Sequence, residues 1–283
     1  MLKKSFIELR AAFRLARVGL HLVWGTVTVA LVYPFVTRRL RLALKRRWSW
    51  QLLETLGVRL YANRQMLTGL VAANHISFLD IFVINAVRPA AFVAKDDVRH
   101  WPLIGWLCAH TETLFLARGS RAAAAQARAE IVGQLRAGEL VAIFPEGTTS
   151  EGAQVLPFHA ALFQSAIDAG RPVTPVLLRY TDASGQRSRA PAYDGEVTML
   201  QCLWAIAHAN GLTAHLEALP PQPVESVDRR HLAAHVHRLI ASHLAQPADR
   251  RAVETPVDLA DALPSNDRPT DSRSPVPEAS LPV

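Results

Sequence analysis

Two side chains five positions apart suggest a general base and its partner. His75 and Asp80 stand in the segment NHISFLD (residues 74–80), directly after the apolar run 67–73. A histidine just past a buried strand lies at the sheet edge where α/β proteins place ligands. If the loop turns into a helix near Ser77, Asp80 can orient one imidazole nitrogen and support the charge formed when the other takes a proton. Taken alone, Ser77-x-x-Asp80 equally fits a capping box beside an incidental histidine.

A second segment offers groups that can hold an anion. FPEGTTS (residues 144–150) follows another apolar run, and its turn carries Gly147 with the hydroxyls of Thr148 and Thr149. Backbone N–H groups and hydroxyls in such a turn can donate to an anion. A carboxylate fits poorly there, so we expect Glu146 to orient a hydroxyl or a basic side chain. The alternative is an ordinary strand-to-helix turn.

Basic residues follow two further apolar runs. The run 113–116 contains Phe115 and is followed by Arg118 and Arg121. The run 91–94 is followed by Lys95. Arginine suits bidentate phosphate binding, whereas a solvated charge at a helix start is the simpler alternative. We expect these groups to lie on the same sheet edge as His75.

The elements that must position these residues alternate between strands and helices. A helix is predicted over residues 121–137, introduced by Ser120 and ended by Gly138. A further strand near 212–219 and a helix over 231–245 complete the pattern. The predicted buried strands are 67–73, 91–94, 113–116, 140–144 and 173–178. Strands alternating with helices predict an α/β domain with a largely parallel central sheet and flanking helices.

The N-terminal part indicates a membrane-associated helical segment. Residues 1–50 hold eleven Lys and Arg against Glu8 alone, a net charge of +10, while the remainder sums to −3. Residues 18–36 carry no formal charge and are long enough to approach a bilayer crossing. Basic residues beside an apolar segment favour anionic lipid over nucleic acid as the partner. Basic flanks on both sides leave open whether the segment spans the bilayer or lies in one leaflet. A buried soluble helix is the alternative.

The C-terminal segment has a different composition. Residues 246–283 hold seven of the 18 prolines and no aromatic residue, which predicts a disordered tail. The two cysteines, Cys108 and Cys202, suggest no disulfide framework. We therefore expect a membrane-anchoring segment (1–50), an α/β catalytic domain (51–245) and the tail.

The ordered set of motifs resembles the phospholipid and glycerol acyltransferase family, which includes 1-acylglycerol-3-phosphate acyltransferases. The family motifs read Asn-His-x-Ser-x-x-Asp, Gly-x-x-Phe-x-x-Arg, Phe-Pro-Glu-Gly-Thr-Arg-Ser and Val-x-Pro-Val. They match in order across about residues 70–180, with the first motif complete and the fourth met at 173–176. The resemblance implies a catalytic pair of His75 and Asp80.

Two departures from the family motifs concern the acceptor. Glu112 replaces the glycine of the second motif, and Thr149 replaces the arginine of the third. The resemblance implies that the basic residues of the second and third motifs hold the acceptor phosphate. Thr149 in place of the arginine then removes one charge-assisted contact, commonly worth ~1.5–3 kcal/mol. Arg118 with Lys95 or Arg121 can compensate on a phosphate monoester. Otherwise the head group differs, and lyso-ornithine lipid is the alternative acceptor.

The expected reaction is direct acyl transfer. His75 takes the proton of the acceptor hydroxyl, which attacks the thioester of acyl-CoA or acyl-carrier protein, and backbone N–H groups near Gly147 assist the oxyanion. The sequence contains no Gly-x-Ser-x-Gly and no His-Glu-x-x-His, so neither an acyl-enzyme nor a metal or other cofactor is implied.

Two other classes of function stay open. The same pair of residues can activate water in a lipid hydrolase, and a silent lipid-binding adaptor would not require His75 and Asp80. For the enzyme we expect a bilayer, a lysophospholipid acceptor and an acyl donor as partners, without nucleic acid. The expected location is the cytoplasmic face of a bacterial inner membrane. The sequence does not predict an oligomeric state.

Overall fold

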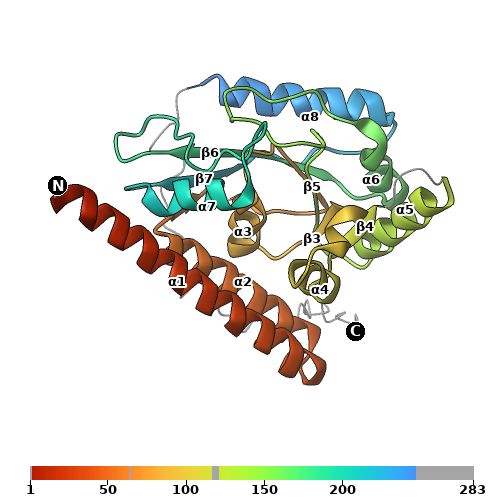
Figure 1. The fold of residues 1–283 in the computed structure, drawn as a ribbon. Coiled ribbons are helices and arrows are strands. Elements are labelled where there is room, and N and C mark those ends of the chain that lie inside the picture. The colour runs from red at the N-terminus through yellow and green to blue at the C-terminus, as the bar shows by residue number, and fades with distance from the viewer. Residues whose placement is uncertain (1, 64, 117–120, 247–283) are drawn as a thin grey trace, which may run out of the picture.

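One seven-stranded sheet runs through the middle of the molecule (Figure 1). The computed structural model describes residues 2–63, 65–116 and 121–246. The strands are β1 (Arg59–Ala62), β2 (Leu70–Ala73), β3 (Ala91–Lys95), β4 (Leu114–Leu116), β5 (Val141–Ile143), β6 (Val173–Thr181) and β7 (Thr213–Ala218). Their order is β1-β7-β6-β2-β5-β3-β4, and all neighbours pair parallel except β6 and β7. The predicted largely parallel α/β sheet is confirmed.

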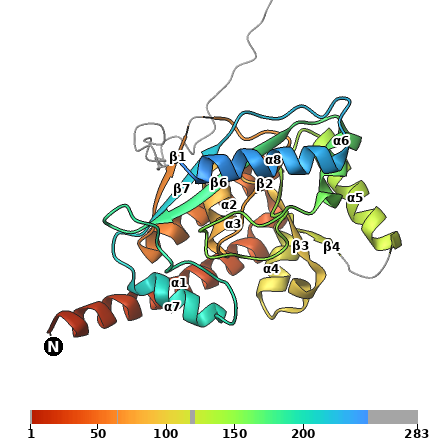
Figure 2. The ribbon, with the colours of Figure 1, turned by 90° about the horizontal axis from the view of Figure 1, so that it is seen from above.

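Helices cover both faces of this sheet (Figures 1 and 2). The helices are α1 (Leu2–Leu31), α2 (Arg38–Leu56), α3 (Leu79–Val87), α4 (Ile104–His110), α5 (Arg121–Arg136), α6 (Phe163–Ala169), α7 (Met199–His208) and α8 (Arg229–Leu244). One buried apolar cluster joins α2, α3 and α7 to the sheet, and a second joins α5, α6 and α8 to the opposite face. Each of these six helices therefore buries one apolar face against the sheet, as layered α/β folds require.

Several elements lie outside the sequence expectations. The predicted helices 121–137 and 231–245 are present as α5 and α8, with ends one or two residues away. Strand β1 and helix α7 were not predicted, and residue 50, the expected end of the N-terminal helical segment, falls inside α2. Apart from Gln246, the predicted tail 246–283 lies outside the described residues.

The sheet order brings the candidate motifs to one edge. Strands β2, β5, β3 and β4 are neighbours and all run parallel, so their C-terminal ends meet at the same edge. The loop 74–80 leaves β2, and the loop 144–150 leaves β5. Lys95 ends β3 and pairs in register with Leu116, the last residue of β4. The topology alone thus gathers segments up to about 70 residues apart in the chain.

Helices α1 and α2 form a closely packed hairpin. Gly25 of α1 lies against Trp48 of α2, and a Cβ at that glycine would overlap the indole nitrogen. The two helices also exchange hydrogen bonds: His21 Nε2 lies 3.0 Å from the Trp48 carbonyl, and Trp48 Nε1 donates to the His21 carbonyl at 3.1 Å. Their rings stack with centroids 4.6 Å apart. The small residue and this pair of rings fix how α1 lies along α2.

The N-terminal half of α1 is also hydrogen-bonded to the end of α7. Arg14 donates to the carbonyls of Ala207 and Ala209 at 3.0 and 2.9 Å, and Arg10 donates to the carbonyl of His208 at 2.9 Å. These carbonyls close the C-terminal end of α7, where cations are favoured. Helix α1 therefore packs as part of one assembly with α2, α7 and the sheet that they cover.

A buried ammonium links α2 to the second motif. Lys45 donates to the carbonyls of Ala90 and Thr111 at 2.8 and 2.9 Å, and its Nζ lies 3.4 Å from Glu112 Oε2. Burial lowers the pKa of Lys45, and the Glu112 carboxylate opposes that effect. Glu112 has φ of +66°, a region that favours the glycine of the family motif. The substitution at this position therefore adds a counter-charge for Lys45.

We predict that Glu112→Gln lowers the free energy of unfolding by about 2 kcal/mol, because a buried ammonium loses its counter-charge. The change keeps the size of the side chain and the backbone strain. Glu139→Gln is the matched control, since Glu139 pairs with the more exposed Arg38 and should cost less than about 1 kcal/mol. Chemical unfolding of both variants in detergent measures the difference. Equal losses would show that Lys45 does not depend on Glu112.

Candidate active site

A fully buried carboxylate organises the loop after β2. Asp80, in the first turn of α3, is 0% exposed, and its Oδ2 lies 2.9 Å from His75 Nδ1. The same oxygen accepts from the backbone N–H groups of Ile76 and Ser77 at 2.7 and 3.0 Å. Because an ionised carboxylate only accepts, Nδ1 carries the proton in this pair. The structure thus places the two predicted residues in direct contact.

The capping-box alternative is realised only in part. Asp80 does reach back to the N–H of Ser77, but the Ser77 hydroxyl accepts from Leu79 N at 3.3 Å, and Phe78 is the N-cap of α3. The reciprocal arrangement of a capping box is therefore absent at this helix start. A single oxygen of Asp80, Oδ2, accepts hydrogen bonds from both the loop backbone and the imidazole.

The other oxygen of Asp80 is bound by a residue that the sequence reasoning missed. Tyr180 in β6 donates its hydroxyl to Asp80 Oδ1 at 2.7 Å. Burial, and then the neighbouring Asp80 charge, raise the pKa of Tyr180 well above its usual value, so its hydroxyl stays protonated. Asn74 ties the same strand to the loop, since its side-chain amide exchanges two hydrogen bonds with the backbone of Leu178 at 2.7 and 3.1 Å. No local spacing in the sequence marks these contacts, because β6 lies a hundred residues away.

The imidazole of His75 stacks on an aromatic ring and stays partly exposed to solvent. Its ring stacks on Phe144, the first residue after β5, with centroids 3.9 Å apart and an interplanar angle of 9°. The side chain is 19% exposed. With Nδ1 engaged by Asp80, Nε2 is the nitrogen that can accept a proton from a substrate hydroxyl, which is the geometry of a general base.

Glu146 holds the backbone of the motifs together. Its Oε1 accepts from the N–H of His75 at 2.9 Å, and its Oε2 accepts from the N–H of Leu156 at 3.2 Å. The expectation that Glu146 orients a hydroxyl or a basic side chain is wrong, because both oxygens bind backbone. Burial raises the pKa of Glu146 to about 7, with a smaller raising effect from Asp80 and opposing effects from the two N–H groups.

The rest of the FPEGTTS segment is mostly structural. Gly147 has φ of +70° and donates its N–H to the Phe144 carbonyl at 3.1 Å, so this N–H closes a turn instead of facing the site. The hydroxyl of Thr149 donates to the Tyr193 carbonyl, while Thr148 is exposed. Position 149, an arginine in the family motif, is therefore hydrogen-bonded to the loop that contains Tyr193 and supplies no cation.

The second motif and the basic residues near it are only partly described. Arg118 lies outside the described residues. Phe115 is half-buried in β4, and the guanidinium of Arg99 lies over its ring at 4.4 Å. Lys95 is exposed at the end of β3 on the same edge. Arg99 is a cation near the candidate site that the sequence reasoning missed, because it belongs to a short helical turn between β3 and α4.

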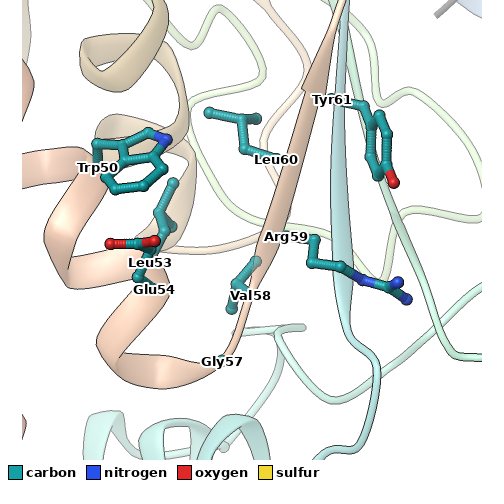
Figure 3. A pocket seen from close by; sticks show the side chains of 8 residues that line it. All are labelled: Trp50, Leu53, Glu54, Gly57, Val58, Arg59, Leu60 and Tyr61. Carbon is teal, nitrogen blue, oxygen red and sulfur yellow. The ribbon is translucent and has the colours of Figure 1, made fainter. Parts of the chain in front are cut away.

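A pocket of about 350 Å³ lies far along the sheet from His75, where the end of α2 meets the edge strand β1 (Figure 3). Its lining residues are Trp50, Leu53, Glu54, Gly57, Val58, Arg59, Leu60 and Tyr61. None of them belongs to the four motifs. Within the described residues, no group of three His, Cys, Asp or Glu is placed to hold a metal ion.

We predict a pH-dependent difference in stability between the wild type and Glu146→Gln. Because the folded-state pKa of Glu146 is about 7 and its ordinary value is 4.5, the unfolded chain loses this proton first. The wild type should therefore lose stability relative to the variant as the pH rises from about 4.5 to 7, with no further loss above pH 8. Chemical unfolding across that range measures the difference, and a constant difference would contradict the raised pKa.

Comparison with known proteins identifies relatives of this chain. Residues 58–179 match the acyltransferase family model. The chain is 41% identical over 181 residues to a 1-acyl-sn-glycerol-3-phosphate acyltransferase of Neisseria meningitidis, covering 64% of this chain and 71% of that one. It is 34% identical over 237 residues to a lyso-ornithine lipid O-acyltransferase of Pseudomonas aeruginosa, covering 82% and 91%.

The fold is also that of a solved structure. The 1-acyl-sn-glycerophosphate acyltransferase of Thermotoga maritima superposes with a TM-score of 0.63 at 20% identity, covering 85% of this chain and 95% of that one. The relatives are enzymes named for acyl transfer to lipids. With the family model matched across the motifs and relatives above 30% identity covered over most of their length, this chain belongs to the acyltransferase family.

Proposed function

We propose that this protein transfers a fatty acyl group from acyl-CoA or acyl-carrier protein to the free hydroxyl of 1-acylglycerol-3-phosphate, which forms phosphatidic acid. The single observation that carries the proposal is the contact between buried Asp80 and the Nδ1 atom of a partly open His75. The identity to the Neisseria meningitidis enzyme supports the choice of acceptor.

The chemistry follows from the free nitrogen of His75. Nε2 accepts the proton of the acceptor hydroxyl as its oxygen attacks the thioester carbonyl, and Asp80 stabilises the imidazolium through Nδ1. When the tetrahedral intermediate collapses, the carbon–sulfur bond breaks and the proton on Nε2 passes to the departing thiolate. The products are an ester and a free thiol, and His75 returns to its neutral form.

A second acceptor is favoured by one observation. The Thr149 hydroxyl is bound to the Tyr193 carbonyl, so the position that bears an arginine in the family motif offers no charge to a phosphate. Two described cations lie near the motif-two strand: Lys95, which is exposed, and Arg99, which is paired with Asp96 at 3.2 Å. Lyso-ornithine lipid is therefore the alternative acceptor, as for the Pseudomonas aeruginosa relative.

The membrane proposal rests on an exposed apolar stripe along α1. Residues 5–35 form a helical stretch long and apolar enough to cross a bilayer. The buried side of α1 faces α2 and α7, and the other side exposes large apolar residues at helical spacing. The stripe consists of Phe6, Leu9, Phe13, Leu20, Trp24, Val27 and Leu31.

The packing of α1 favours an orientation in the plane of one leaflet. Helix α2 runs along α1 and carries six Lys and Arg residues, and a spanning α1 would draw them into hydrocarbon at several kcal/mol each. Leu200 and Trp204 of α7 and Trp106 of α4 are exposed apolar residues on helices that contact α1, and exposed Trp101 lies just before α4. We propose that this face rests on the cytoplasmic leaflet, with Trp residues at the interface.

We predict that His75→Ala and Asp80→Asn each lower kcat/KM for acyl transfer by about 10²–10⁴, the usual contribution of a positioned general base. The measurement uses purified protein in detergent with acyl-CoA or acyl-carrier protein. Lysophosphatidic acid and lyso-ornithine lipid compete as acceptors. His231→Ala is the matched control, because His231 forms an exposed His–Asp pair with Asp228 at the start of α8.

The products decide between the candidates. Phosphatidic acid that is lost in both site variants and kept in His231→Ala supports the proposal. Product from lyso-ornithine lipid alone assigns the second acceptor, and release of free fatty acid without transfer would make the protein a hydrolase. Full activity of His75→Ala would contradict the general-base role.

We predict that both ends of α1 stay on one side of the membrane. Cysteines introduced at exposed Ser5 and Arg39 should both react with an impermeant maleimide in inside-out bacterial vesicles, and neither should react in right-side-out vesicles. The unsubstituted chain gives the background from Cys108 and Cys202. Reaction of one position in each kind of vesicle would show a spanning helix instead.

A further inference from the structure

The hydroxyl of Tyr180 is buried in an apolar environment and yet has one strong partner. The residue is 3% exposed and belongs to the apolar cluster between the sheet and α3. Its ring would fill this space equally well as phenylalanine, and a buried hydroxyl is costly unless it is hydrogen-bonded. Its partner is Asp80 Oδ1 at 2.7 Å. The hydroxyl therefore acts on the carboxylate and adds nothing to the packing.

The four donors to Asp80 are unevenly distributed. His75 Nδ1 and two backbone N–H groups converge on Oδ2, all from the loop that the carboxylate itself organises. Tyr180 alone, among the described donors, binds Oδ1, and it comes from the neighbouring strand β6. A carboxylate bound through one oxygen can rotate about its terminal torsion, which is broad. A second anchor on the other oxygen fixes the plane in which Oδ2 meets the imidazole.

We propose that Tyr180 is a positioning residue for the reaction: it fixes the Asp80 carboxylate and lowers the proton affinity of the His75–Asp80 pair, so that Nε2 is free to accept the acceptor proton at working pH. This inference rests on the proposed acyl transfer. A donor to the anion stabilises the state in which the pair has lost its proton. Removing the donor raises the proton affinity of the pair, whichever atom holds the proton.

The other titratable groups packed around Asp80 do not supply this effect. Cys202 of α7 is neutral, because burial raises its pKa to about 11. Glu146, from the loop after β5, titrates near pH 7 and is present equally in the wild type and in a Tyr180 variant. The influence of Glu146 on the His75–Asp80 pair therefore cancels when the wild type and the Tyr180 variant are compared. Tyr180 differs from both because its hydroxyl donates directly to Asp80 and stays protonated.

The test is the pH dependence of kcat/KM for Tyr180→Phe. The acid limb, where protonation of the His75–Asp80 pair stops catalysis, should move to higher pH by about one unit, as loss of one hydrogen bond to a charged group implies. At a pH on the former limb, activity then falls about tenfold more than on the plateau. Tyr33→Phe is the matched control, because buried Tyr33 donates to the backbone carbonyl of Arg41 instead.

A uniform loss of activity with an unmoved acid limb would overturn the inference and leave Tyr180 a structural residue. If Tyr180→Phe does not fold, fluorotyrosine in the wild-type chain replaces it. Fluorination makes the phenol a stronger donor, so the limb should move to lower pH, and no movement would again overturn the inference. Wild type without acyl transfer at any pH would instead contradict the proposed function. The pH midpoint of the His75 ring resonances would then test Tyr180 without turnover.

Discussion

The site depends on one buried carboxylate. An ionised side chain without solvent exposure is costly unless its lone pairs are satisfied, and Asp80 meets this requirement with four donors from two parts of the chain. Two are loop N–H groups, one is the His75 ring and one is the hydroxyl of Tyr180. The same contacts that make the burial tolerable also shape the loop 74–80, select the Nδ1–H form of His75 and leave Nε2 for the substrate.

The sheet supplies the partners for this carboxylate. Strand β2 lies between β5 and β6, so the loop that leaves it is bound on one side by Glu146 and on the other by Tyr180. Phe144 completes the arrangement by stacking on the imidazole. On the outer face of the helical layer, the α1–α2 hairpin is fixed to α7 through Arg14. A membrane surface that binds α1 would therefore be held at a constant orientation to the site, which suits a lipid acceptor.

The sequence predicted those features that depend on short spacing. His75 and Asp80 are five residues apart, and a loop that turns into a helix must bring them together, so their contact was predictable. The parallel sheet followed from alternating apolar runs. The contact of Tyr180 with Asp80 and the role of Glu146 were not predictable, because they depend on which strands are neighbours. The hydroxyl of Thr149 and the counter-charge at Glu112 likewise act on segments far away in the chain, which no local pattern encodes.

The protonation state of His75 tests the account most directly. In protein labelled with ¹⁵N-histidine, two-bond proton–nitrogen correlations distinguish the two neutral tautomers, and the His75→Ala variant identifies the signals. The account predicts that neutral His75 carries its proton on Nδ1, donated to Asp80, with Nε2 unprotonated. A neutral ring protonated on Nε2 would contradict it, because the nitrogen facing the substrate could then no longer accept the hydroxyl proton.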